Sequence, residues 1–192
     1  MNLNLVTTEF QKISTVEIPD IFYNRFKTNN DNLDTIFGEG ILPGSSITLT
    51  ATPGAGKSTL SFQLCEMLSK NGYRVGYASG EESRVQLAFT CKRLNIEDVL
   101  VANIKDVDSI VHQMQNFDVL VIDSFQALTS KHDHNTREFE KYAVDKLVTR
   151  AKELNCALIF IVHLTKLGQM KGTTLLPHTV DVNIRIDKVD DD

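Results

Sequence analysis

Short apolar runs alternate along the chain with longer segments in which apolar residues recur every three or four positions. Short runs of this kind are typical of buried strands, and the periodic segments are typical of helices that bury one face. The runs that predict strands cover residues 46–50, 74–79, 99–102, 118–123, 157–162 and 180–186. The segments that predict helices cover residues 31–37, 59–68, 83–94, 107–117 and 137–154.

The strand runs also predict the kind of sheet. Residues 119–122 and 157–162 are apolar at every position, which is typical of parallel strands covered on both faces, whereas residues 180–186 alternate as an edge strand does. Because helices separate the strands, we expect an α/β fold with a mainly parallel central sheet and helices on both faces. We expect this core to cover residues 31–192, after an N-terminal extension over residues 1–30.

The spacing within a periodic segment predicts which side chains point inward. In residues 83–94 we expect Val85, Ala88, Phe89 and Leu94 to form the buried face of a helix. Their successive spacings of three, one and five residues follow the helical repeat only approximately.

The composition limits the class of protein to which this chain can belong. The 192 residues are 42% hydrophobic with a formal net charge of −5, so the chain is an ordinary globular protein without a generally basic surface. It has no apolar run that could span a bilayer and no signal-peptide start, so we expect no membrane association. Cys65, Cys91 and Cys156 lack Cys-x-x-Cys spacing, which favours reduced thiols in a cytoplasmic protein over a zinc site.

One turn carries the clearest chemical signal. Residues 51–58 have the sequence Ala-Thr-Pro-Gly-Ala-Gly-Lys-Ser and lie between a predicted strand and a predicted helix. This context is typical of a phosphate-binding loop, in which backbone N–H groups and a helix N-terminus hold phosphate oxygens. Gly54 and Gly56 let the backbone approach the phosphates, and Lys57 can reach the β- and γ-phosphates of ATP. The predicted ATP contacts are Pro53, Gly54, Ala55, Gly56, Lys57, Ser58 and Thr59.

Asp123 closes the apolar run 119–122 and marks a second part of the site. Ligands of α/β sheets bind at the carboxyl ends of strands, and an acid there can hold Mg²⁺, often through water. We therefore expect Ser58 and Asp123 to form the Mg²⁺ site. The alternative role for Asp123 is that of a turn cap.

Three further side chains follow predicted strands and are candidates for catalysis. Glu81 or Glu82 could deprotonate or orient the water that attacks the γ-phosphate, with a slight preference for Glu82. The alternative is that these acids stabilise the start of the next helix through its dipole. His163 closes another strand and is a candidate γ-phosphate sensor, the alternative being a surface histidine.

A long stretch without acids is a candidate nucleic-acid contact. Between Leu154 and Val180 there is no Asp or Glu, although the protein is acidic, and Lys166 and Lys171 lie within this stretch among glycines. Such a loop can bind the phosphate backbone of single-stranded DNA, the alternative being an ordinary surface loop. A second, less distinctive DNA-contact loop carries the basic residues Lys131 and Arg137.

These residues together resemble the RecA-like P-loop ATPase superfamily, most of all its RadA/Sms branch and next the KaiC-type ATPases. Besides the phosphate loop, the resemblance rests on residues 77–83 with Gln86, 121–126, 163–166 and 178–181. It extends over residues 25–187 and implies a RecA-like ATPase core.

The resemblance implies an ATP-binding, Mg²⁺-dependent ATPase that acts in DNA recombination, repair or replication and binds single-stranded DNA. Turnover would be slow, or would depend on DNA or a partner, and the implied protein partners are further copies of the chain or a recombinase or replication protein. We find no match to the basic segment that reaches a neighbour's γ-phosphate in these families, so we predict no oligomeric state. The alternative is a KaiC-like, nucleotide-gated regulatory or scaffold protein with weak or no turnover that acts through a protein partner.

Overall fold

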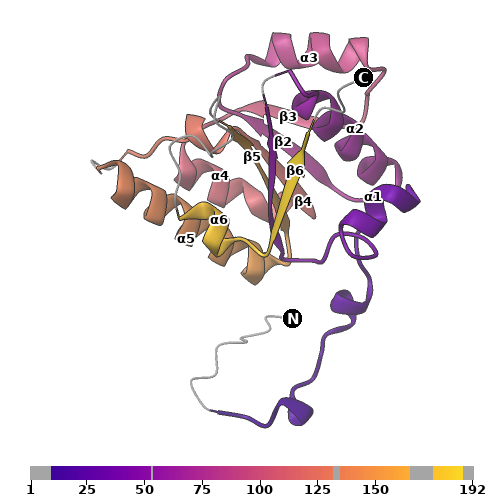
Figure 1. Cartoon of the computed structure of the whole chain (residues 1–192), viewed down its shortest axis with the longest axis vertical. Coiled ribbons are helices and arrows are strands. Elements are labelled where there is room, and N and C mark those ends of the chain that lie inside the picture. Colours follow the sequence, from indigo (N-terminus) through magenta and orange to yellow (C-terminus); the bar gives the residue numbers. More distant parts are fainter. Residues whose placement is uncertain (1–9, 53, 132–134, 165–174, 188–192) are drawn as a thin grey trace.

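A six-stranded parallel sheet forms the centre of the molecule, with the strand order β3-β2-β4-β5-β1-β6 (Figure 1). The computed structural model describes residues 10–52, 54–131, 135–164 and 175–187. The strands are β1 (Ser46–Ala51), β2 (Val75–Ser79), β3 (Leu100–Asn103), β4 (Val119–Asp123), β5 (Ala157–His163) and β6 (Val182–Ile186). The predicted α/β class is confirmed.

Helices cover both faces of this sheet, as Figure 1 shows. They are α1 (Asp31–Ile36), α2 (Lys57–Lys70), α3 (Arg84–Arg93), α4 (Val107–Gln113), α5 (Thr136–Leu154) and α6 (Leu176–Thr179). Short polar residues set their starts: the side chains of Ser83, Asp106 and Asn135 each accept a hydrogen bond from a backbone N–H in the first turn. In the described part of the chain, no helix combines the length and the apolar character that crossing a membrane requires.

Two apolar cores lie on opposite faces of the sheet. Leu120 and Ile122 of β4 belong to the core under α4 and α5, whereas Val119 and Val121 belong to the core under α2. Successive side chains of a strand point to opposite faces, so a central strand with a core on each side must be apolar at every position. This explains the unbroken apolar runs of β4 and β5.

At one edge of the sheet, β6 pairs with β1 alone among the described strands, and its residues alternate between half-buried and exposed. Polar contacts reinforce this pairing. Thr48 Oγ1 donates to Asn183 Oδ1 at 2.6 Å, and Ser46 Oγ donates to Asp181 Oδ2 at 2.7 Å. The predicted edge strand is therefore confirmed.

The predicted buried face of α3 is partly wrong. Val85 and Phe89 are 79% and 72% exposed and Ala88 is also exposed, whereas Leu87 is 1% exposed. Leu87 and the half-buried Cys91 and Leu94 contact the core, because their spacing of four and three residues places them on one side of the helix. Apolar residues lie on both sides of this helix, so the spacing alone selected the wrong side.

The last residues of the expected N-terminal extension pack against the core. Phe26 is buried and forms an antiparallel bridge with Ile41. Asp34 of α1 accepts two hydrogen bonds from Thr28, from its backbone N and from its Oγ1, each at 2.8 Å. Residues 10–24 extend away from the body of the molecule (Figure 1).

Replacing Asp34 by Ala should lower the free energy of unfolding by about 1–3 kcal/mol, because two buried donors of Thr28 lose their acceptor. Urea unfolding measures this change. Asp31→Ala removes an exposed carboxylate from the same helix and serves as the matched control. Equal stability of the two variants would contradict the anchoring role of Asp34.

Candidate functional site

The sheet register brings the candidate residues to one edge. Ala51 of β1 lies opposite His163 of β5, and Ser79 of β2 lies opposite Asp123 of β4. These four strands are neighbours in the order β2-β4-β5-β1, and all are parallel. The phosphate loop and the segments that follow β2, β4 and β5 therefore emerge side by side.

The phosphate loop has the backbone that the sequence predicts. Gly54 and Gly56 have φ angles of 77° and 84°, a region that side chains with a Cβ rarely adopt. Helix α2 begins directly after Gly56, so its first N–H groups have no partner within the helix. Lys57 is buried and its Nζ donates to the carbonyl of Ala51 at 3.3 Å, which holds its charge over the loop. Pro53 lies outside the described residues.

Asp123 is buried at the end of β4 and is held by a tyrosine. Tyr77 Oη donates to Asp123 Oδ2 at 2.5 Å. Burial raises the pKa of Asp123, whereas the Tyr77 hydrogen bond and the charges of His163 and Lys57 act in the opposite direction. Burial also raises the pKa of Tyr77, so its hydroxyl remains a donor. The sequence analysis did not assign Tyr77 to the site. The one signal for it in the sequence is a hydroxyl-bearing side chain within a buried strand.

Glu81 is the centre of a polar cluster. Ser124 Oγ donates to Glu81 Oε1 at 2.6 Å, and His163 Nε2 lies 3.3 Å from the same oxygen. The Gln126 side chain fixes the backbone of His163, accepting from its N–H at 3.3 Å and donating to its carbonyl at 3.4 Å. The structure thus brings together Glu81 and His163, and adds Ser124 and Gln126, which sequence reasoning had not assigned.

Glu82 is placed differently from its neighbour. Its backbone is fixed by Ser79 Oγ, which accepts from Glu82 N at 3.0 Å, and by Asn103 Nδ2, which donates to Glu82 O at 2.8 Å. Within the described residues its carboxylate makes no hydrogen bond or ion pair. Partial burial raises the pKa of Glu82, and the charges of Asp123 and Glu81 add to this effect.

Gly80 determines how closely this segment approaches the end of β4. A Cβ on Gly80 would lie 2.6 Å from the Cβ of Ala127. Gly80 N donates to Asp123 O at 2.7 Å. Only glycine allows the backbone before Glu81 and Glu82 to lie this close to Asp123.

The donor set at this edge fits Mg²⁺. The Ser58 hydroxyl and the Asp123 carboxylate are oxygen ligands, which Mg²⁺ prefers. Tyr77 occupies Asp123 Oδ2, while Oδ1 accepts no hydrogen bond from the described residues. In that part of the chain no group of three or more His, Cys, Asp or Glu side chains could hold a metal alone, so phosphate oxygens and water would have to complete the shell.

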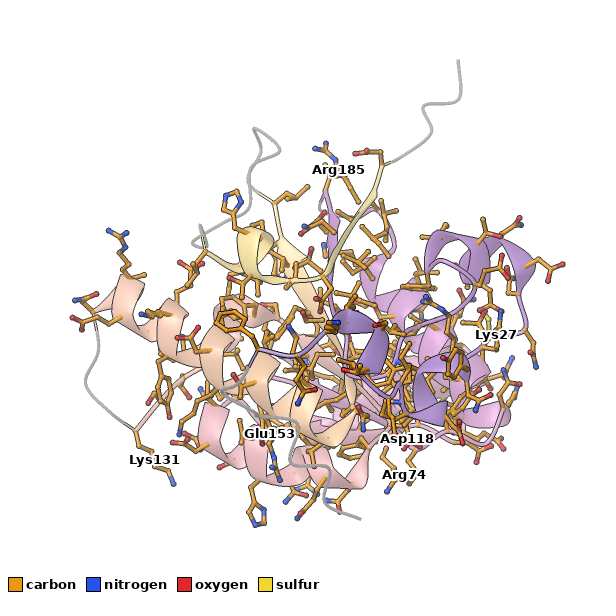
Figure 2. All side chains as sticks on the ribbon, turned by 90° about the horizontal axis from the view of Figure 1, so that it is seen from below. Lys27, Arg74, Asp118, Lys131, Glu153 and Arg185 are labelled. Atoms are coloured by element: carbon orange, nitrogen blue, oxygen red, sulfur yellow. The ribbon has the colours of Figure 1, made fainter. Side chains whose placement is uncertain are left out.

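The predicted DNA contacts lie partly outside the described residues, as is the case for Lys166 and Lys171. Lys131 and Arg137 are both exposed, but Arg137 lies in the first turn of α5 and not in the predicted loop, because Asn135 caps the helix before it. Figure 2 shows Lys131 projecting outward, in the segment that precedes α5. Contact of these four side chains with DNA stays a prediction.

Comparison with known proteins identifies relatives over most of the chain. Residues 13–169 match the family model described as "AAA domain". DNA repair protein RadA of Campylobacter jejuni is 31% identical over 189 residues, which are 94% of this chain and 42% of the relative. RadA of Streptococcus pneumoniae is 33% identical over 187 residues, which are 93% of this chain and 44% of the relative. The chain therefore spans less than half the length of these relatives.

Solved structures share the architecture. The ATPase domain of G40P superposes with a TM-score of 0.69 at 14% identity, covering 83% of this chain and 75% of that one. The RadB recombinase superposes with a TM-score of 0.62 at 18% identity, covering 86% and 84%. At this level of identity the likeness concerns the fold. With the family match and the RadA relatives, it leads to one conclusion: the chain belongs to the AAA domain family and has the fold of the RecA-like ATPases.

Proposed function

We propose that this chain binds ATP together with Mg²⁺, hydrolyses it, and acts in DNA recombination or repair. The observation that carries the proposal is the convergence, at one sheet edge, of the phosphate loop, Asp123 and two glutamates. The RadA relatives are DNA repair proteins by name, which supports the proposed role in DNA recombination or repair. Three free cysteines suit a cytoplasmic location. We assign this activity to a core over residues 31–192.

In this proposal the phosphates of ATP lie on the N-terminus of α2. The contacts come from the backbone of residues 53–59 and from the ammonium of Lys57, which a shift away from the Ala51 carbonyl would bring to the β- and γ-phosphates. Ser58 binds Mg²⁺ directly, and Asp123 holds its water shell. When bound, Mg²⁺ offsets negative charge on the β- and γ-phosphates.

The contacts of the two glutamates favour different roles. Glu81 Oε1 is engaged by Ser124 and lies next to His163, so we assign Glu81 to the sensor, where it links His163 to the loop after β4. The carboxylate of Glu82 is unoccupied by described residues, and its raised pKa suits a general base. We therefore assign Glu82 to proton transfer from the attacking water.

Single-stranded DNA is the proposed macromolecular ligand. Lys131 precedes α5 and Arg137 lies in its first turn, and both follow β4 along the chain, whereas Lys166 and Lys171 follow β5 in the sequence. The carboxyl ends of β4 and β5 lie at the same edge as the phosphate loop. Contact between His163 and the γ-phosphate would then couple nucleotide state to DNA affinity. Further copies of the chain, or a recombinase or replication protein, are the proposed protein partners.

Lys57→Ala should weaken binding of ATP-Mg²⁺ by about tenfold to a hundredfold, because a hydrogen bond to a charged group contributes about 1.5–3 kcal/mol. Titration with a fluorescent ATP analogue measures the loss. Lys70→Ala, at the opposite end of α2, removes an exposed lysine and should leave affinity unchanged. Unchanged affinity in a folded Lys57→Ala protein would refute the binding site.

Glu82→Gln should lower kcat by on the order of 10²–10⁴-fold, the usual contribution of a general base, while ATP binding persists. Glu81→Gln should reduce kcat less, because it removes a sensor contact rather than the base. The raised pKa of Glu82 means that the base becomes protonated at a higher pH than an ordinary glutamate, so parental activity should be lost on the acid side as pH falls through that value. Parental turnover by Glu82→Gln would show that the base is elsewhere.

The double variant Lys166→Glu/Lys171→Glu should weaken binding of a labelled oligonucleotide in ATP-Mg²⁺, equally for every sequence. The slope of log affinity against log salt should shrink by about one unit per lost phosphate contact. Lys92→Glu/Arg93→Glu makes the same charge change on exposed residues of α3 and is the control. A parent chain that binds no oligonucleotide would contradict the DNA proposal, and equal binding by both double variants would contradict its placement on this loop.

A further inference from the structure

Tyr77 connects the phosphate-loop helix to the carboxylate at the end of β4. Its ring stacks on that of Phe62 in α2, with centroids 4.2 Å apart and planes 15° from parallel. Its hydroxyl donates to Asp123 Oδ2 at 2.5 Å. Tyr77 and Phe62 are each 1% exposed, so neither ring can move without disturbing the core. We call this connection the Phe62–Tyr77–Asp123 link.

The link reaches the face of α2 that carries Ser58. Phe62 follows Ser58 by four residues, one turn of helix, so the two side chains lie on the same face. The stack therefore supports the helix directly behind Ser58. Because the same tyrosine holds Asp123, one side chain fixes the relative positions of the two groups assigned to the metal site.

The hydrogen bond also selects which oxygen of Asp123 is available. Tyr77 occupies Oδ2, and Oδ1 accepts no hydrogen bond from the part of the chain that the structure describes. Without the hydroxyl, this buried carboxylate would lose the one side-chain donor that the described residues give it, and it could rotate. Partners of this kind, which hold a metal ligand from behind, typically change metal affinity by about 10–100-fold when they are removed.

We propose that Tyr77 is a positioning residue that sets the affinity of the nucleotide site for Mg²⁺, by holding Asp123 Oδ2 and leaving Oδ1 available to the hydrated metal. This inference rests on the proposed function, because it requires that ATP and Mg²⁺ bind at this edge. It adds a separate claim, namely that a hydroxyl touching neither metal nor nucleotide controls the metal requirement.

Tyr77→Phe removes this hydroxyl and keeps the ring on Phe62. The test is titration of a fluorescent ATP analogue, once in EDTA and once over a range of Mg²⁺ concentrations. We expect affinity in EDTA to stay within about twofold of the parent, and the Mg²⁺ concentration for half-maximal enhancement of binding to rise by about 10–100-fold. A purely structural role for Tyr77 would change both affinities together or neither, and either result would overturn the proposal.

Tyr73→Phe is the matched control. It also removes a tyrosine hydroxyl that makes a hydrogen bond in the folded protein. Tyr73 Oη accepts from Lys27 N at 3.3 Å, and the ring packs edge-on against Phe26. That contact lies at the N-terminal segment rather than at the phosphate loop. The Mg²⁺ dependence of Tyr73→Phe should equal that of the parent.

Asp123→Asn separates failure of this inference from failure of the proposed function. If Asp123→Asn leaves the Mg²⁺ dependence unchanged, the metal assignment itself is wrong. If Asp123→Asn changes it and Tyr77→Phe does not, the metal assignment stands and only the role of Tyr77 is wrong. If Tyr77 acts through Asp123, Tyr77→Phe should have no further effect in the Asp123→Asn protein.

Should Tyr77→Phe fail to fold, Phe62→Leu tests the same link from the other side. It removes the stacking partner and keeps the hydroxyl and the carboxylate. We expect a smaller rise in the Mg²⁺ requirement, in the same direction, with affinity in EDTA preserved. An unchanged Mg²⁺ requirement in folded Phe62→Leu would then overturn the proposal.

Discussion

Burial of the sheet on both faces is the constraint on which the rest of the structure depends. Strands β4 and β5 send alternate side chains into two separate cores, so their interiors have no room for polar chemistry. In these two strands polar groups can then be placed only at the strand ends, and in parallel strands those ends share an edge. Because both faces of the sheet are buried, Lys57, Asp123 and His163 lie together at one edge of the sheet, although they are distant in sequence.

The charge at this edge is unbalanced. The charges of Glu81 and Asp123 both raise the pKa of Glu82, and the charge of Glu81 also raises that of Asp123, whereas Lys57 and His163 act on Asp123 in the opposite direction. Phosphates added to such a site would meet an excess of negative charge. Under the proposed function, Mg²⁺ would therefore offset two repulsions: that among the phosphates, and that between the phosphates and the carboxylates that the fold has brought together.

Features with a local signature were predictable from the sequence. The phosphate loop depends on glycines and a lysine within eight residues, and β4 on five consecutive positions, so both were found without tertiary information. The buried side of α3 could not be predicted in this way, because Phe89 and Leu87 are both apolar. Only packing against the sheet decides which of the two points inward. The partner of Asp123 was missed for a related reason: Tyr77 is 46 positions away and meets it only through strand pairing.

The backbone of His163 is bound on both its N–H and its carbonyl by one amide, that of Gln126. A side-chain amide that mimics a neighbouring strand in this way continues the sheet ladder beyond the last true pair of β4 and β5. The end of β5 and the turn after β4 are consequently fixed to each other. Any displacement of the His163 main chain is therefore transmitted to Gln126 and the turn around it, so the end of β5 cannot shift without the turn that follows β4.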